Sequence, residues 1–256
     1  MNECTLNKKA ICIIPARYES TRLPGKPLIN IGGKPLLQWV WESAKKSINL
    51  SRVIIATDDE RISDLCKKIG AEYLLTPKDI QSGSDRIAYT YQFLKEDADI
   101  ILNLQGDEPL IKADVIDLLI NQFTLSNADV GTLIKKINTN DELFNPSVVK
   151  VIIGKNNYAL YFSRSPIPHL RDFKEENWLD KEQFWKHIGI YAYRKKTLLE
   201  FSNLKPSKLE LAEKLEQLRL LENGSKYLCI ETDMELIGVD TKDDIEKVEK
   251  ILLKTN

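Results

Sequence analysis

A cationic loop follows the first apolar run of the chain, and its residue types suit a polyanionic ligand. The segment IIPARYESTRLPGKPL carries Arg17, Arg22 and Lys26, with prolines that restrict its backbone. Two guanidinium groups, an ammonium group and backbone donors can surround the phosphates of a nucleoside triphosphate. The alternative is a solvated charged loop. The segment is not a P-loop, because Pro27 follows Lys26, so we expect a different phosphate-binding arrangement.

Carboxylates follow two later apolar runs. Gln105, Gly106 and Asp107 come directly after residues 100–104, and Asp240 follows the last predicted strand in IGVDT. In open parallel sheets the ligand crevice lies beyond the carboxyl ends of the strands. Mg²⁺ typically takes one or two carboxylates together with substrate phosphates, so we predict that Asp107 and Asp240 bind Mg²⁺. The alternatives are an Asp-containing turn and a helix cap.

Other polar residues could read the rest of a nucleotide or a second substrate. Ser82 and Gly83 form a small-residue turn before a predicted helix, where capping is an equally good role. Arg164 precedes a Pro-bounded turn and could grip a carboxylate. The spacing around His187 and Tyr191 favours a structural histidine.

An amphipathic stretch near the carboxyl end carries two further polar candidates. Glu216 and Gln217 lie on its polar face, and Leu211, Leu215 and Leu218 are predicted core. Such a face is usually only solvated, so the pattern alone does not assign these two residues to a substrate.

The elements that must position these residues follow an alternating strand and helix pattern. Apolar runs rich in Ile and Val alternate with helical periodicity in the first half, which indicates an α/β fold with a mainly parallel central sheet. Strands are predicted over residues 10–14, 53–56, 73–75 and 100–104.

The second half of the chain has a different texture. A β-rich insertion is predicted over about 145–195, followed by a helix over 208–222 and a strand over 227–230. Thr241 and Asp244 have capping-box spacing ahead of a last helix. The pattern contains no linker, so we expect one domain over residues 1–256.

Composition excludes several classes of partner. The 256 residues include 37 Lys and Arg against 38 Asp and Glu, a net charge of -1, which argues against nucleic-acid binding. No apolar run approaches the roughly 20 residues of a membrane span, and no secretion signal opens the sequence. The four cysteines show neither zinc-site nor disulfide spacing. We therefore expect a cytoplasmic protein with free thiols.

An ordered set of segments between residues 13 and 248 resembles a known family. The segments are IPARYESTRLPGKPL, ATDDERI, QSGSDRI, NLQGDEPLI, NPSVVKV, ALYFSRSPIP, HIGIYAYR, EKLEQLRLLENG and VDTKDDIEKV. In this order they resemble the 3-deoxy-D-manno-octulosonate (Kdo) cytidylyltransferases. Related sugar nucleotidyltransferases share the first loop, so the whole set carries the resemblance.

The resemblance implies a fold, a reaction and an assembly. The fold would be the Rossmann-like nucleotide-diphospho-sugar transferase type. The reaction would be CTP + Kdo → CMP-Kdo + pyrophosphate, with Mg²⁺ as cofactor, for lipopolysaccharide biosynthesis. The β-rich insertion would form a homodimer.

The resemblance also implies roles for individual residues. It places CTP on Arg17, Arg22, Lys26, Ser82, Gly83 and Gln105, and Mg²⁺ on Asp107 and Asp240. Arg17, Lys26, Asp107 and Asp240 would be the catalytic set. It places the sugar acid against Arg86, Arg164, His187, Tyr191, Glu216 and Gln217.

Alternatives within the same chemistry remain open from sequence. QSGSDR stands where the family often has Thr and Glu. A related subgroup that uses the 8-amino sugar has Gln at the position of Glu108, so Glu108 favours ordinary Kdo. A sialic-acid type cytidylyltransferase is a second alternative. A non-catalytic nucleotide-binding protein of the same fold is a third.

Overall fold

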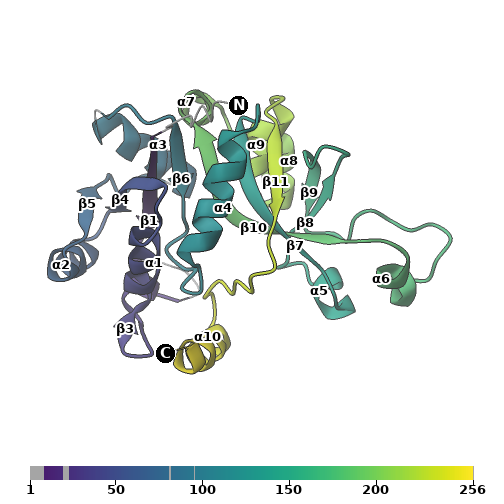
Figure 1. The fold of residues 1–256 in the computed structure, drawn as a ribbon, viewed down its shortest axis with the longest axis horizontal. Coiled ribbons are helices and arrows are strands. Elements are labelled where there is room, and N and C mark those ends of the chain that lie inside the picture. The colour runs from purple at the N-terminus through teal and green to yellow at the C-terminus, as the bar shows by residue number, and fades with distance from the viewer. Residues whose placement is uncertain (1–8, 20–22, 81, 95, 256) are drawn as a thin grey trace, which may run out of the picture.

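A single mixed sheet forms the centre of the computed structural model (Figure 1). The structure describes residues 9–19, 23–80, 82–94 and 96–255. The order of the strands along the sheet is β11-β7-β10-β6-β1-β4-β5. Their bounds are β1 Ala10–Ala16, β4 Leu50–Thr57, β5 Glu72–Leu75, β6 Ile100–Asn103, β7 Val130–Lys136, β10 Trp185–Arg194 and β11 Tyr227–Glu231. β1, β4, β5 and β6 are mutually parallel, as predicted.

Helices cover both faces of the sheet because the strands are apolar on both sides. In β1, Cys12 and Ile14 belong to one buried cluster, while Ile11 and Ile13 belong to the other. The first cluster packs against α1 Leu36–Lys45, α2 Glu60–Ile69 and α4 Ala113–Thr124. The second packs against α3 Gly83–Leu94, α7 Lys195–Asn203 and α9 Gln217–Glu222. This two-sided burial produces the near-continuous apolar strands in the sequence.

The predicted strands of the first half are all present, but β7 is an element that the sequence reading missed. β7 pairs in parallel with β11 and antiparallel with β10. Its sequence, VGTLIKK, has no alternation, and its pairing partners are distant in the chain. Pairing over long sequence separations is not visible in a local pattern.

The β-rich insertion is real, but its last strand belongs to the main sheet. β8 Lys150–Ile153 and β9 Ala159–Ser163 form an antiparallel pair, and β8 also pairs with β10. β10 then runs antiparallel between β7 and β6. The insertion therefore helps to build the sheet that carries the site.

Between β9 and β10 the chain extends away from the sheet (Figure 1). This excursion contains the short helices η2 Glu175–Asn177 and α6 Trp178–Lys181. Trp178 and Phe184 pack with Leu143 of α5 Asn140–Phe144 in a small apolar cluster. The cluster anchors the excursion at the end of β7.

The helix predicted over residues 208–222 is broken. α8 Lys208–Glu213 ends at Lys214, whose φ of 54° lies in the left-handed region, and α9 starts at Gln217. Arg219 of α9 donates to both carboxylate oxygens of Glu210, at 2.8 and 2.6 Å, and so ties the two short helices together. The break places Glu216 and Gln217 at the start of a new helix instead of along one polar face.

The carboxyl-terminal part closes the fold around the crevice. No helix or strand occurs over residues 232–241. The sequence pattern predicted Asp240 at the end of a strand, but in the structure Asp240 lies well beyond the end of β11. α10 Lys242–Thr255 follows, and the reciprocal bonds of Thr241 and Asp244 confirm the capping box. α10 packs beside the hairpin of β2 Asn30–Ile31 and β3 Lys34–Pro35.

Helix length and composition also bear on membrane insertion. None of the helices in the described ranges has the length and apolar character needed to cross a bilayer.

Candidate active site

The first cavity is a cleft of about 840 Å³ at the carboxyl ends of β1 and β6. The chain leaves β1 toward β4 on one side, and β6 joins β1 on the other, so the cleft lies where the strand order reverses. Of the residues predicted to form the site, it brings together Arg17, Lys26, Gly83, Gln105, Asp107 and Asp240. Arg22 lies outside the described residues.

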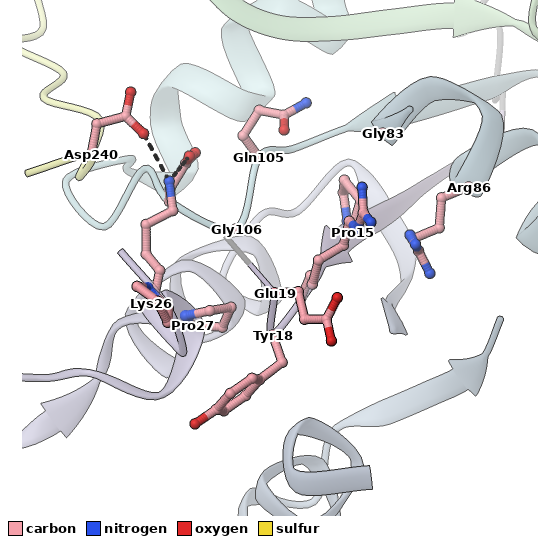
Figure 2. Close-up of a pocket in the computed structure, with 14 residues that line it drawn as sticks. Pro15, Tyr18, Glu19, Lys26, Pro27, Gly83, Arg86, Gln105, Gly106 and Asp240 are labelled. Atoms are coloured by element: carbon pink, nitrogen blue, oxygen red, sulfur yellow. Dashed lines mark hydrogen bonds and ion pairs between the residues drawn. The ribbon is translucent and has the colours of Figure 1, made fainter. Parts of the chain in front are cut away.

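Lys26 and the two predicted metal-binding carboxylates converge in this cleft (Figure 2). Lys26 begins the short helix η1 Lys26–Leu28. Its Nζ donates to Asp107 Oδ2 at 2.6 Å and to Asp240 Oδ1 at 3.0 Å. Burial opposes the charge on Lys26, but the two carboxylates outweigh it and raise the pKa of the ammonium group. The three residues come from three distant parts of the chain.

The loop after β6 can approach β1 closely because it contains a glycine. A Cβ on Gly106 would lie 3.1 Å from the backbone oxygen of Pro15 and 3.3 Å from Leu37 Cδ1. Any larger residue would push the turn away from β1. Gly106 therefore brings Asp107 into the cleft, as the sequence predicted.

Asp58 organises two arginines at the cleft and was missed from sequence. Its Oδ2 accepts a bond from Arg86 Nη2 at 2.8 Å and lies 3.7 Å from Arg17 Nε. Arg86 is fully buried, and this desolvation lowers the pKa of its guanidinium group. The signal was available, because Asp58 directly follows β4 at the same sheet edge.

Arg86 has partners that its predicted role did not include. It lines the first cleft and not the second cavity, and its contact with a sugar acid stays a prediction. Its partners, which include Thr76 and Ile80, hold it inside the protein. Arg86 therefore holds Asp58, whose Oδ2 lies 3.7 Å from Arg17 Nε at the wall of the cleft.

One wall of the cleft is lined by small and amide-bearing residues. Gln105 Nε2 donates to Asn103 Oδ1 at 2.8 Å, and a Cβ on Gly83 would lie 3.9 Å from the Gln105 amide. Ser82 Oγ accepts from the backbone N–H of Asp85 at 3.0 Å and donates to its carboxylate. Ser82 thus caps α3, the alternative role considered from sequence.

The second cavity, of about 630 Å³, lies on the other side of Asp240. Three of the six predicted sugar-acid residues line it: His187, Tyr191 and Gln217. Asp240 lines both cavities, so the two spaces meet at a carboxylate.

The polar groups of the second cavity are desolvated by aromatic neighbours. The His187 ring packs edge-on against Phe162 and tilted against Tyr191, with Thr132 Oγ1 2.9 Å from Nε2. Burial lowers the pKa of His187 far below its usual 6.5, and burial raises the pKa of Tyr191. Both side chains are therefore neutral hydrogen-bonding groups near pH 7.

Glu108 and Lys186 also line this cavity, and sequence reasoning gave neither a contact role. Burial and the neighbouring Asp107 raise the pKa of Glu108 to about 8. Its Oε2 is buried and has no hydrogen-bond partner among the described residues. Lys186 pairs with Glu142 and, at 3.5 Å, with Glu235. The tandem acids of GDEP were the available signal for Glu108.

Arg164 and Glu216 do not line the second cavity, so their contacts with the sugar acid stay predictions. Arg164 donates to the backbone oxygens of Glu213 at 2.8 Å and of Pro146 at 3.0 Å. Glu216 accepts from Ser84 Oγ at 2.9 Å, and burial raises the pKa of its carboxyl group. These contacts depend on the break at Lys214, which the sequence pattern did not reveal.

The described residues offer a pair of carboxylates at the cleft as the candidate metal site. No group of three or more His, Cys, Asp and Glu residues suited to hold a metal occurs within the described ranges. Asp107 and Asp240 are a pair, with side chains 31% and 43% exposed toward the cleft. A pair of carboxylates suits an ion that takes its remaining ligands from phosphates and water.

Comparison with known proteins gives this geometry a family. Residues 11–235 match a family model described as cytidylyltransferase. A 3-deoxy-manno-octulosonate cytidylyltransferase of Parabacteroides distasonis is 47% identical over 243 residues, covering 93% of this chain and 96% of that protein. The enzyme of the same name from Chloroherpeton thalassium is 47% identical over 250 residues, covering 96% and 98%.

Solved structures agree with the sequence comparison. A structure of CMP:2-keto-3-deoxy-manno-octonic acid synthetase complexed with CTP matches with a TM-score of 0.89 at 40% identity, covering 97% of this chain and all of that one (100%). A Leptospira borgpetersenii cytidylyltransferase, with a TM-score of 0.63, 18% identity and coverage of 96% and 87%, shares the fold alone. The resemblance and the Rossmann-like fold predicted from sequence are thus confirmed, and the chain belongs to the 3-deoxy-manno-octulosonate cytidylyltransferase family.

Proposed function

We propose that the protein transfers CMP from CTP to the anomeric 2-hydroxyl of Kdo, releasing pyrophosphate and supplying CMP-Kdo for lipopolysaccharide biosynthesis. The observation that carries this proposal is the shared carboxylate of Asp240, where a cationic cleft meets a cavity that contains the neutral hydrogen-bonding groups His187 and Tyr191. Family membership supports both substrates, because the relatives are named for this reaction and one structure was solved with CTP.

In this proposal the first cleft binds CTP. Arg17 and Lys26 contact the phosphates from the loop after β1, and Arg22 belongs to the same loop in the sequence. The wall formed by Gly83 and Gln105, with Ser82 at the start of α3, faces the cytidine. A triphosphate fits where several positive groups already pair with acids, since a ligand of higher charge can replace those acids.

Asp107 and Asp240 would hold the Mg²⁺ ion. Their carboxylates converge on one cation position and remain partly exposed to the cleft, which fits an ion that also binds phosphate. When bound, the ion would neutralise negative charge on the phosphates.

The chain's own residues would then align the two substrates and stabilise the leaving group. The 2-hydroxyl attacks the α-phosphorus and loses its proton to water, and the bond between the α-phosphorus and the bridging oxygen to the β-phosphate breaks, which releases pyrophosphate. Lys26 and Arg17 stabilise the charge that develops on pyrophosphate. His187, Tyr191 and Gln217 orient the sugar acid, and Lys186 offsets repulsion between its carboxylate and the triphosphate.

A pyrophosphate-release assay tests the proposal. Release should require CTP, Kdo and Mg²⁺ together, and UTP or ATP should replace CTP poorly. The 8-amino sugar and a sialic acid are tested in parallel, because a faster rate with either would assign a different sugar acid. Calorimetric binding of CTP without turnover on any of these acids would instead indicate a nucleotide-binding protein.

The homodimer and the cytoplasmic location stay predictions. β9 pairs with β8 and carries Leu160, which is 63% exposed, so the β-rich insertion presents an exposed apolar side chain to a second copy. Light scattering after size-exclusion chromatography measures the mass. A monomer at micromolar concentration would contradict the predicted dimer.

A further inference from the structure

Lys26 occupies the point at which the two proposed metal ligands converge (Figure 2). A single Nζ atom lies 2.6 Å from Asp107 and 3.0 Å from Asp240. The Lys26 side chain is only 14% exposed, whereas Asp107 and Asp240 are 31% and 43% exposed. The Lys26 side chain is therefore more buried than the two carboxylate side chains, which line the cleft.

This arrangement solves an electrostatic problem of the free protein. Two carboxylates directed at one point repel each other, and a cation between them offsets that repulsion. The backbone also links the two acids, because Val239 N donates to Asp107 O at 2.9 Å. The acids are thus held in place by the chain itself, with Lys26 as their counter-ion.

A divalent ion and the ammonium group cannot occupy the same contacts with both carboxylates. We propose that Lys26 is a resident counter-ion that keeps divalent metal weakly bound until nucleotide arrives and then transfers its ammonium group to the phosphates. This inference rests on the proposed function for the identity of the nucleotide. It assigns Lys26 two successive sets of partners instead of one.

The local structure suits such a transfer. Pro27 restricts the backbone after Lys26, and the backbone N–H of Lys26 donates to Leu23 O at 3.2 Å, so the movement falls on the side-chain torsions. The lysine stem is long and flexible, and its compact ammonium group can exchange one oxygen ligand for another. Lys26 therefore couples the two ligands: nucleotide removes the competitor for the metal site, and metal occupies the acids that Lys26 leaves.

Metal titration without sugar acid tests the inference. Mn²⁺ alone is titrated into the wild type, Lys26→Met and Lys26→Arg, with binding followed by electron paramagnetic resonance of free Mn²⁺. Lys26→Met should bind Mn²⁺ alone about ten-fold more tightly than the wild type, because a competing charge about 3 Å from each ligand is gone. Lys26→Arg keeps the charge and should stay near the wild type.

A second titration adds CTP at saturating concentration. The wild-type affinity for Mn²⁺ should rise by a larger factor than that of Lys26→Met, because only the wild type has an ammonium group to move. Lys34→Met is the matched control. Lys34 Nζ lies 2.7 Å from Glu42 Oε2, and neither residue lines the cleft. The loss of Lys34 should therefore leave both titrations unchanged.

Thermal unfolding provides a readout that is independent of activity. Mg²⁺ should raise the unfolding midpoint of Lys26→Met more than that of the wild type, since tighter ligands stabilise more at equal concentration. Equal Mn²⁺ affinity of wild type and Lys26→Met without nucleotide, including undetectable binding by both, overturns the inference. Failure of the proposed function is seen in a different measurement, because the wild type would then release no pyrophosphate from CTP and Kdo.

Discussion

The two cavities on either side of Asp240 are built from different chemistry. In the first cleft the charged side chains pair with one another: Lys26 with Asp107 and Asp240, and Asp58 with Arg86. In the second cavity, Tyr191 and His187 are desolvated and neutral near pH 7. Ion pairs organise the first cleft, whereas in the second cavity aromatic packing and hydrogen bonds hold His187, beside the ion pair of Lys186 with Glu142.

The difference fits the ligands that we propose for the two spaces. A polyanion needs several cations at fixed positions, and those cations must have partners while the ligand is absent. A polyhydroxy acid needs donors and acceptors of defined shape, whose strength increases when water is excluded. Substitutions in the two spaces should therefore affect the use of CTP and of Kdo separately, except at the residues that the spaces share.

Asp107→Asn should have the largest effect and should impair the use of both CTP and Kdo. It removes a proposed metal ligand and one partner of Lys26, so turnover should fall by roughly a thousand-fold while the fold persists. Pyrophosphate release measures the rate, and circular dichroism checks the fold. Asp64→Asn is the control, because Asp64 is 69% exposed and pairs only with Lys67 within one helix in the described ion pairs. A near-wild-type rate at saturating Mg²⁺ would remove Asp107 from the metal site.

Lys26→Met should impair the use of CTP more than the use of Kdo. The loss of a phosphate contact should lower kcat/KM for CTP by about 10- to 100-fold, with a smaller change in the KM for Kdo. Steady-state kinetics with each substrate varied in turn gives both values. An equal loss for the two substrates would argue against a phosphate contact.

Gln217→Leu should impair the use of Kdo more than the use of CTP. Gln217 is 5% exposed and lines the second cavity, and Leu keeps most of its volume while removing the amide. The KM for Kdo should rise about ten-fold, with the KM for CTP unchanged. Gln38→Leu is the control, since the Gln38 amide bonds Glu42 and lines neither cavity. The comparison fails if the KM for CTP changes as much as the KM for Kdo.

The smallest effect concerns the protonation of His187. Its folded-state pKa is far below 6.5, so between pH 7.5 and 5.5 protons bind the unfolded chain but not the folded one. Stability should therefore fall as the pH drops through 6.5, and His187→Gln should lose less stability over that interval. Urea unfolding midpoints at each pH measure the difference. Parallel curves for the two proteins would show that His187 titrates normally in the fold.

Residues that follow parallel strands could be placed from the sequence alone. Arg17, Gln105 and Asp107 come soon after buried runs, and the rule for open parallel sheets brings such ends together at one edge. The same rule applied to β4 would have found Asp58. The part of the site that depends on local order was therefore predictable.

The lining of the second cavity depends on tertiary contacts that no local sequence pattern contains. β10 enters the main sheet from the insertion, and the chain breaks at Lys214 between two short helices. Those two features decide that Gln217 faces the cavity while Arg164 binds backbone oxygens. The resemblance supplied the names of these residues, but only the tertiary pairing gives their partners.

The segment over residues 232–241 has a practical consequence for work with this protein. It carries Asp240 outside any helix or strand and joins α10 through the Thr241 cap, while a bond from Gly32 N to Glu249 at 3.0 Å ties α10 to the β2–β3 hairpin. An affinity tag that unfolds α10, or a protease that cleaves this segment, should displace Asp240, a proposed metal ligand. Activity should then be lost while the sheet stays folded. Preparations with native spectra and poor specific activity should therefore be checked first for an intact tail by mass spectrometry.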